Sequence, residues 1–225
     1  MRVRPFTGGR ITPGRIGGVY LPPPAASGPA FRAASSTTTI TGGGGFTLTA
    51  PTGTVAGDVL IVQFYDVIDS KSGTVGTAPV GWTQRGTGDD VNSPHIVWRT
   101  FSRVATGSDS FVWSGGSNWT APLMAAMIAV SGATAVDVAG TVSFSGATAA
   151  SVTTTAPTLL VGLWTTQTTS TAAPASMTSR VSMTNIGGPS LLIATESLAA
   201  SGATGTRVSP TASVSFRLAQ LIAVK

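Results

Sequence analysis

The stretch Asp58-Val-Leu-Ile-Val-Gln-Phe-Tyr65 is almost continuously apolar and has the length of one β-strand. The turn-rich segment Pro51-Thr-Gly-Thr-Val-Ala-Gly57 precedes it, and an apolar run bounded in this way indicates a strand that is buried on both faces. Further strand candidates lie on either side, at Phe46-Thr-Leu-Thr49 and within residues 122–130. Short strands spaced about 8–12 residues apart by Gly- and Pro-containing turns are typical of sandwiches and barrels, so we predict an all-β fold.

The landmarks of this region recur later in the chain. Residues 56–131 and 156–224 carry them in the same order, at offsets from 94 (Ala125 to Ala219) to 100 (Ala56 to Ala156). Each half supplies four or five strands, too few to bury an apolar face alone, so we predict a jelly-roll-like antiparallel β-sandwich of two similar halves packed face to face. The matched segments are Ala56-x-x-x-Leu60 with Ala156-x-x-x-Leu160, Pro79-x-x-x-Thr83-x-Arg85 with Pro174-x-x-x-Thr178-x-Arg180, Thr100-x-Ser102-x-x-Ala105-x-Gly107 with Thr195-x-Ser197-x-x-Ala200-x-Gly202, and Ala125-x-x-Ile128-Ala-Val130 with Ala219-x-x-Ile222-Ala-Val224.

Each half contains a Thr-x-Arg pair, ending at Arg85 and at Arg180. Side chains alternate between the two faces of a strand, so each pair lies on the face opposite a preceding large residue, Trp82 or Met177. We expect Trp82 and Met177 to fill equivalent core positions and the two arginines to cover an outer face.

The composition favours strands and argues against helical classes. Only 9% of the 225 residues are charged, and 35 are threonine, whose β-branched side chain suits strands. Long charged helix formers are almost absent, which excludes a helical bundle or coiled coil, and no run approaches the ~20 apolar residues of a membrane-spanning helix. The chain has no cysteine, which excludes disulfides, thiolate metal sites and cysteine nucleophiles.

The net charge of +5 belongs to the N-terminal part of the chain. Five arginines precede the first acidic residue, Asp58, whereas the eight basic and eight acidic side chains after residue 32 cancel. Residues 1–45 are otherwise rich in Gly, Pro, Ser and Thr, and their scattered large apolar side chains cannot form a core by themselves. We therefore predict an extended basic arm and linker over residues 1–45 and a sandwich domain over residues 46–225. Within the first part, residues 35–41 are either linker or a first edge strand.

Three interpretations of this arm remain open: a solvated tail, a tether for nucleic acid, and an arm that becomes ordered against a protein partner. The arginines are spread along the arm and not clustered, so nucleic acid is not the expected partner. Proline keeps such an arm extended and lowers the entropy lost on docking, which favours a protein partner. The residues expected to dock are Arg2, Arg4, Phe6, Arg10, Ile11, Arg15, Ile16, Tyr20 and Arg32.

Few residues suit catalysis or metal binding. His95 is the sole histidine, which excludes a multi-histidine metal site, and no Gly-x-Ser-x-Gly motif accompanies it. The chain has no Asp-x-Asp-x-Asp-Gly calcium loop, and its carboxylates offer no pattern for paired acid–base chemistry. We expect no enzyme, no catalytic residue, no metal and no cofactor.

Trp119 stands out because it borders a small polar loop, in Trp-Ser-Gly-Gly-Ser-Asn-Trp-Thr. Aromatic side chains on sandwich loops often stack on sugar rings, so Trp119 is a candidate for contact with a glycan. Packing within the core or the loop, and contact with a partner protein, are the two alternatives. The sequence leaves all three open.

Several of these segments together resemble a β-sandwich module of tailed bacteriophages, found in minor tail and other virion proteins of actinobacterial phages. The resemblance covers about residues 46–225 and implies a jelly-roll-like fold and a place in the virion, with no catalytic residues. Gly107-Ser-Asp-Ser110 departs from the pattern of the module, which leaves that loop uncertain. The segments are Val55-Ala-Gly-Asp-Val-Leu-Ile-Val, Pro79-Val-Gly-Trp-Thr, Ser102-Arg-Val-Ala-Thr, Ser151-Val-Thr-Thr-Thr and Glu196-Ser-Leu-Ala-Ala-Ser-Gly-Ala-Thr-Gly-Thr-Arg207.

We therefore expect a non-enzymatic virion structural protein, and a minor tail or tail-tip component before a capsid decoration protein. A carbohydrate-binding host-receptor module is the alternative from a different class. The expected partners are other virion proteins, through the arm, further copies of the chain, and, in the alternative, a host-surface glycan; neither a membrane nor nucleic acid is expected. The first residues hold no continuous apolar run, which predicts that no signal peptide is present. Together with the virion location that the resemblance implies, this predicts assembly into virions in the host cytoplasm.

Overall fold

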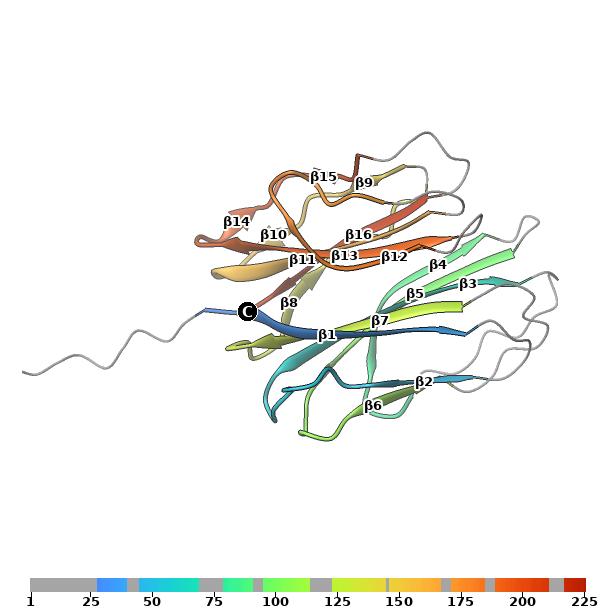
Figure 1. Cartoon of the computed structure of the whole chain (residues 1–225). Helices are drawn as coiled ribbons and strands as arrows, with labels where there is room; N and C mark the ends of the chain where they lie inside the picture. Colours follow the sequence, from blue (N-terminus) through green and yellow to red (C-terminus); the bar gives the residue numbers. More distant parts are fainter. Residues whose placement is uncertain are drawn as a thin grey trace, which may run out of the picture.

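The computed structural model describes residues 28–39, 45–68, 79–90, 95–113, 123–144, 146–166, 171–184, 189–210 and 217–225. It confirms an all-β protein in which two antiparallel five-stranded sheets pack against each other as a sandwich (Figure 1). No helix in these residues has the length and hydropathy needed to cross a membrane.

The two sheets have the same strand order. The first sheet contains β1 (Ala30–Thr39), β7 (Leu123–Ser131), β3 (Val59–Ile68), β5 (His95–Val104) and β4 (Thr83–Asp90), in the order β1-β7-β3-β5-β4. The second contains β8 (Val136–Ala139), β16 (Arg217–Val224), β11 (Thr158–Thr166), β13 (Ser190–Leu198) and β12 (Thr178–Thr184), in the order β8-β16-β11-β13-β12. The four pairs of matched sequence segments lie on or beside corresponding strands of the two sheets.

Strand pairing shows which residues of the two halves correspond, and it corrects the sequence alignment for one pair of strands. Leu60 of β3 pairs with Arg103 of β5, and Leu160 of β11 pairs with Glu196 of β13. Since Leu60 corresponds to Leu160, Arg103 corresponds to Glu196, an offset of 93 (196 minus 103). The sequence alignment of β5 with β13 uses an offset of 95 and is therefore two residues out of register. A shift of two leaves every side chain on the same face, so the apolar pattern does not reveal it.

Short strands cover the outer face of each sheet. Over the first sheet, β2 (Phe46–Thr49) pairs with β6 (Ser110–Trp113). Over the second, β9 (Thr148–Ala149) pairs with β15 (Arg207–Val208), and β10 (Thr153–Thr154) pairs with β14 (Gly202–Ala203). The backbone therefore forms four layers, with the two large sheets inside (Figure 1).

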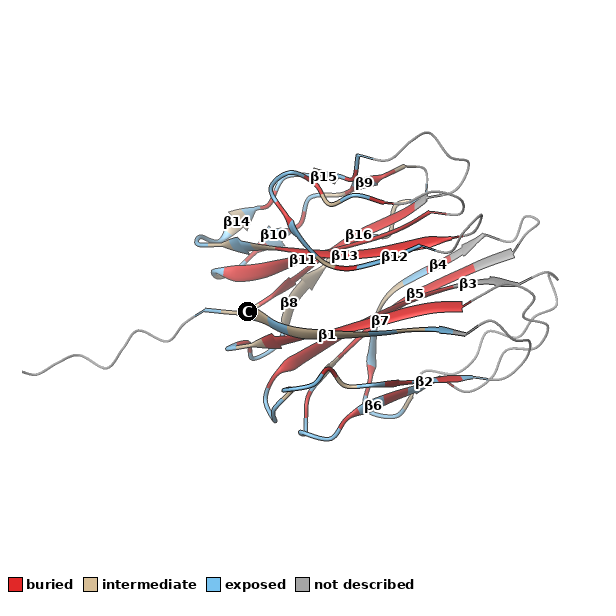
Figure 2. Ribbon diagram, viewed as in Figure 1, coloured by how far each residue is buried: buried red, intermediate tan, exposed pale blue. Residues whose placement is uncertain are grey.

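These layers enclose three apolar cores, and the central strands are buried on both faces (Figure 2). Trp98 lies between the two large sheets, Phe64 lies under the β2–β6 pair, and Trp164 lies under the short strands of the second half. Trp82 and Met177 are buried in the two outer cores, which confirms that they fill equivalent core positions. Burial on both faces explains why β3, β7 and β11 are nearly continuous apolar runs.

The expected position of the two arginines is wrong. Arg85 and Arg180 are the extra residues at β-bulges in β4 and β12. The Arg85 Nε donates to the Ser102 hydroxyl at 2.6 Å, and the Arg180 Nε donates to the Thr195 hydroxyl at 2.8 Å. Because the short outer strands bury the faces that carry Trp82 and Met177, the opposite faces, with the arginines, border the space between the sheets.

The expected domain boundary at residue 46 is also wrong, because β1 already belongs to the first sheet. Two nitrogens of the Arg32 guanidinium bind the two carboxylate oxygens of Asp58. Nε lies 2.7 Å from Oδ2, and one terminal nitrogen donates to Oδ1 at 3.1 Å. The Arg180 guanidinium carbon lies 4.4 Å from the centre of the Phe31 ring. Arg32 is therefore part of the sandwich and not of the docking arm. β1, the strand that carries Arg32, is rich in Ala, Ser and Thr and lacks the apolar run that marks the inner strands.

Candidate functional site

Most of the predicted site residues lie outside the described part of the chain. These are Trp119 and the arm residues Arg2, Arg4, Phe6, Arg10, Ile11, Arg15, Ile16 and Tyr20. His95 begins β5, where it pairs with Ile68. Among the described residues there is no group of three or more His, Cys, Asp or Glu side chains that could hold a metal ion.

Both sheets bring strand ends together at one end of the sandwich, which we call the proximal end. In the first sheet Ala30 pairs with Ser131, and Val59 pairs with Val130. In the second sheet Thr158 begins β11, and a surface hollow is lined by both Ala30 and Thr158. The described chain starts here, so the basic arm joins the sandwich at its proximal end.

Two adjoining shallow hollows mark this end. One has a volume of about 400 Å³ and lies between Gly28, Pro29 and Ala30 on one side and Pro157 and Leu198 on the other. The second, of about 380 Å³, follows the loop over residues 197–204. Ser197, Leu198 and Ala199 line both hollows, which therefore form one open surface of mostly small side chains beside the start of β1.

The four carboxylates whose side chains the structure describes all lie near the proximal end. Each forms an ion pair with a cation and accepts hydrogen bonds from a neighbouring loop or turn. The groups are Asp58 with Arg32 and the Val55 amide, Asp109 with Arg103, Thr106 and the Gly107 amide, Asp137 with Lys225 and Thr155, and Glu196 with Arg207 and Ser176. These ion pairs hold the loops of the proximal end against the strands.

Two of these ion pairs correspond to each other with their charges reversed. Arg103 on β5 binds Asp109 at 3.1 Å, and the corresponding Glu196 on β13 binds Arg207 at 2.8 Å. In each half, a charged side chain near the end of a strand forms an ion pair with a residue after that strand, and the ion pair holds the loop against the sheet. Sequence reasoning missed this correspondence because the residue types are exchanged and the alignment was out of register. The available signal was an opposite charge six residues after Arg103 and eleven after Glu196.

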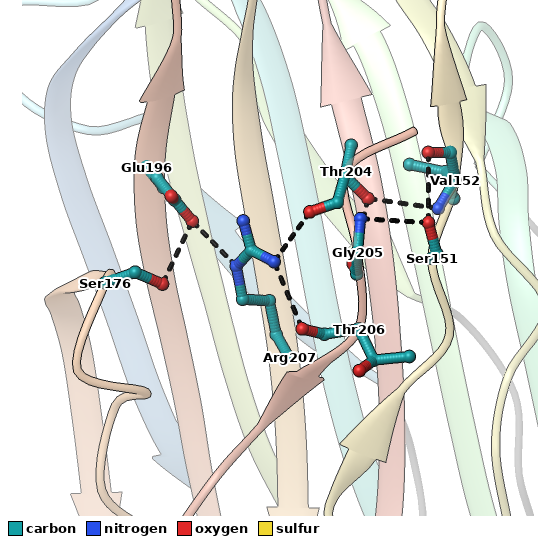
Figure 3. Close-up of polar contacts among 8 residues, drawn as sticks. All are labelled: Ser151, Val152, Ser176, Glu196, Thr204, Gly205, Thr206 and Arg207. Atoms are coloured by element: carbon teal, nitrogen blue, oxygen red, sulfur yellow. Dashed lines mark hydrogen bonds and ion pairs between the residues drawn. The ribbon is translucent and has the colours of Figure 1, made fainter. Parts of the chain in front are cut away.

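Arg207 is the centre of the polar contacts drawn in Figure 3. Its Nε donates to Glu196 Oε2 at 2.8 Å, and one terminal nitrogen donates to the carbonyl oxygens of Thr204 (2.7 Å) and Thr206 (3.1 Å). The Ser176 hydroxyl donates to the same Glu196 oxygen at 3.2 Å. The guanidinium therefore binds both the loop and β13, and charge-assisted bonds of this kind are stronger than neutral ones.

The same loop is also bound to the segment before β10. The Val152 amide donates to the Thr204 hydroxyl at 3.1 Å, and the Gly205 amide donates to the Ser151 hydroxyl at 3.0 Å (Figure 3). One wall of the hollow over residues 197–204 is consequently held from two sides. The surface beside the start of β1 is therefore a pre-formed platform, and binding there would not require these loops to become ordered.

Asp137 shows how strongly these groups favour their charged forms. Burial raises the pKa of the Asp137 carboxyl, but hydrogen bonds from Lys225 and Thr155 outweigh it, and the pKa falls to about 2. The Lys225 Nζ lies 2.7 Å from Asp137 Oδ1. The pKa of Asp109 is lowered in a similar manner: burial opposes the shift, and hydrogen bonds from Thr106 and Gly107, together with the positive charge of Arg103, outweigh it.

We expect an acid-sensitive contribution from Asp137. A folded-state pKa of about 2 lies below the unfolded value of about 3.9, so the stabilisation is present above pH 4 and is lost as the pH falls towards 2. Because 39% of the Lys225 side chain is exposed, solvent screening limits the effect to about 1 kcal/mol. Urea unfolding of the wild type and of Asp137→Asn at pH 5, 3 and 2 measures it. The variant should lose less stability over this range, and equal losses would contradict the assignment.

The described carboxylates thus serve to hold loops, and the candidate site is the open surface that these loops line beside the start of β1. Comparison with known proteins identifies no relative: no family model matches the chain, and no curated protein or solved structure is similar to it.

Proposed function

We propose that the chain is a non-enzymatic structural protein of a tailed-phage virion, a minor tail or tail-tip component that docks through its proximal end and its basic arm. The observation that supports this proposal most is the position of the arm. Residue 28 continues directly into β1, beside the hollows and the loops that the ion pairs hold. An extended arm and a pre-formed platform would thus contact the same partner.

The opposite end of the sandwich would face away from the particle. Register places Ile68 opposite His95, Thr39 opposite Leu123, and Thr166 opposite Ser190, so these strand ends meet at the distal end. The connection that contains Trp119 joins β6 to β7, and Leu123 begins β7 at this end. That β7 starts at this end, four residues after Trp119 in the chain, favours the second candidate, a glycan-binding module in which Trp119 would contact a host-surface sugar.

Deletion of residues 1–27 tests the docking proposal. The deletion should be made before residue 28, because β1 belongs to the sandwich. We expect the truncated protein to keep its β-sheet circular dichroism and its melting transition, and to lose at least about tenfold in binding to phage particles or isolated tails. Binding at the wild-type level would overturn the proposal.

Charge variants separate the arm from the platform. Replacing Arg2, Arg4, Arg10 and Arg15 with serine should weaken docking, while lysine at the same positions should retain part of it, because Lys keeps the charge but not the planar fork. Arg32→Ala is the matched control, since Arg32 binds Asp58 within the sandwich. It should lower stability and leave docking intact.

Imaging of labelled protein on particles distinguishes the tail proposal from a capsid decoration protein. Density on the capsid would replace the tail assignment and keep the docking mechanism. For the glycan candidate, the isolated protein should bind host-surface glycans and Trp119→Ala should abolish this binding. Absence of binding by the wild type would remove that candidate.

A further inference from the structure

We infer that the free edge of β1 pairs with the same strand of a second copy, so that the first sheets of two protomers form one continuous antiparallel sheet. β1 stands at the end of the strand order and pairs with β7 on one side only. Among the described strands, none pairs with its other side. An edge strand of this kind presents unpaired N–H and C=O groups to a further strand.

The other three edges of the two large sheets carry features that discourage such pairing. β4 has a bulge at Arg85 and two glycines, and its last two residues are Asp89 and Asp90. β12 has a bulge at Arg180, and β8 is only four residues long. Bulges, charges and short strands are the usual means by which an edge is protected.

β1 lacks this protection over most of its length. Its bulge and its only charge occur together at Arg32, next to its first residues. From Ala33 to Thr39 the strand pairs regularly with β7 and contains only Ala, Ser and Thr, with no proline and no glycine. A regular, uncharged segment of seven residues at a sheet edge is the part of the molecule best suited to pair with another strand.

The segment is complementary to itself. An antiparallel pair centred near Ser35 and Ser36 would set Ser, Thr and Ala opposite one another, and such pairs stabilise a sheet by contact and hydroxyl hydrogen bonds. No like charges would meet, because Arg32 would lie near the far end of the partner strand. The occupant that fits is therefore a second copy of this chain, related by a two-fold axis.

β1 is also held in place before any partner arrives. Arg32 binds Asp58, Phe31 lies under Arg180, and the Ser35 hydroxyl donates to the Thr49 carbonyl at 2.7 Å. These contacts tie β1 to β12 on one face and to β2 on the other. A two-fold axis perpendicular to the sheet would place β12 and β2 beside the same strands of the second copy, which enlarges the interface. This pairing does not depend on what the arm binds.

Sedimentation or light scattering of the full chain across a range of concentrations tests the inference. We expect a dimer, or a larger assembly built from dimers, whose dissociation constant rises at least tenfold in Ser36→Lys/Thr38→Lys. Both side chains are exposed, so the fold should be unaffected, as circular dichroism can verify. The matched control is Gln84→Lys/Thr87→Lys, which adds the same charge at exposed positions of the opposite edge, β4, and should leave the assembly unchanged.

Cross-linking gives an independent readout, because the chain has no cysteine. Single cysteines at positions 35, 36, 37 and 38 should form disulfide-linked dimers most readily at the position nearest the two-fold axis, with yields that fall on either side. If the wild type is still monomeric at about 100 µM, its self-association is too weak for a specific dimer, and the inference would be overturned. Dimers that the β1 lysines do not weaken, or equal cross-linking at all four positions, would also overturn it.

Discussion

Gly162→Ala is expected to lower the free energy of unfolding by about 3 kcal/mol, at the upper end of the usual effect of overpacking. Gly162 lies in β11 beneath the ring of Trp164, which is 1% exposed and donates its Nε1 hydrogen to the Ala147 carbonyl at 2.9 Å. A Cβ atom at Gly162 would clash with this ring and come within 3.0 Å of Met177 Cε. The end of the Met177 side chain can shift, but the Trp164 ring is fully buried in the outer core and cannot move without disturbing its hydrogen bond and packing.

The first sheet shows how this clash can be relieved. By the correspondence of Leu60 with Leu160, Val62 and Phe64 occupy the places of Gly162 and Trp164. In the first sheet, the smaller ring of Phe64 thus stands where the second sheet has Trp164, and it leaves room for Val62 where the second sheet has Gly162. Trp164→Phe should therefore be less destabilising in the Gly162→Ala background than in the wild type, with a coupling free energy above about 1 kcal/mol in a double-mutant cycle.

Urea unfolding of the four proteins measures the cycle. Gly146→Ala is the control for the glycine substitution, since a Cβ there would meet nothing nearer than the Thr148 nitrogen at 3.8 Å. It should change stability by less than about 0.5 kcal/mol. Additive effects at positions 162 and 164 would show that the ring does not limit the space at Gly162.

Gln220→Leu should destabilise the protein by about 3 kcal/mol, because it removes the polar contacts that join the two sheets. Gln220 is fully buried in β16. Its Oε1 accepts from the Thr100 hydroxyl at 2.9 Å, and its Nε2 donates to the carbonyl oxygens of Arg85 (2.9 Å) and Gly140 (2.7 Å). Leucine would fill the volume and leave the buried Thr100 hydroxyl and the two part-buried carbonyl oxygens without their partner.

Gln63→Leu is the matched comparison. Gln63 is also fully buried, but its Nε2 makes one longer bond, 3.3 Å to the Trp164 carbonyl, and its Oε1 has no partner among the described residues. Its replacement should change stability by about 1 kcal/mol or less, in either direction. Chemical denaturation of both variants tests the contrast, and equal losses would show that the number of hydrogen bonds does not determine the effect.

The apolar runs and their repetition predict much of the fold. Val59 to Tyr65 and the corresponding run in β11 are buried on both faces, and the position of matched segments on corresponding strands follows from their order. The outer layers were not predictable in the same way. β9, β10, β14 and β15 have two residues each, too few for any periodicity. Without this outer layer, the core that contains Met177 looks like the space between the two sheets, and Arg180 is then expected on an outer face.

Less of the candidate site could be predicted. The concentration of charge in the arm is visible in the sequence, and residues 35–41 suit either a linker or an edge strand. The full extent of β1 is not visible, because an edge strand held by Arg32, Phe31 and β7 needs few apolar residues of its own. The ion pairs of the proximal end depend on loops that return to strands. Only the strand register shows that Arg103 and Glu196 occupy corresponding positions.

The pairing of β1 with β7 has a consequence for biosynthesis. Ala30 and Ser131 lie 101 residues apart in the chain, so the first sheet closes only after most of its residues have left the ribosome. The apolar inner face that carries Trp98 then stays uncovered until β16, at residues 217–224, completes the second sheet. Distant pairings of this kind fold slowly, and nascent chains with exposed sheets aggregate. Slower synthesis at low temperature, or added chaperone, should therefore raise the yield of folded protein.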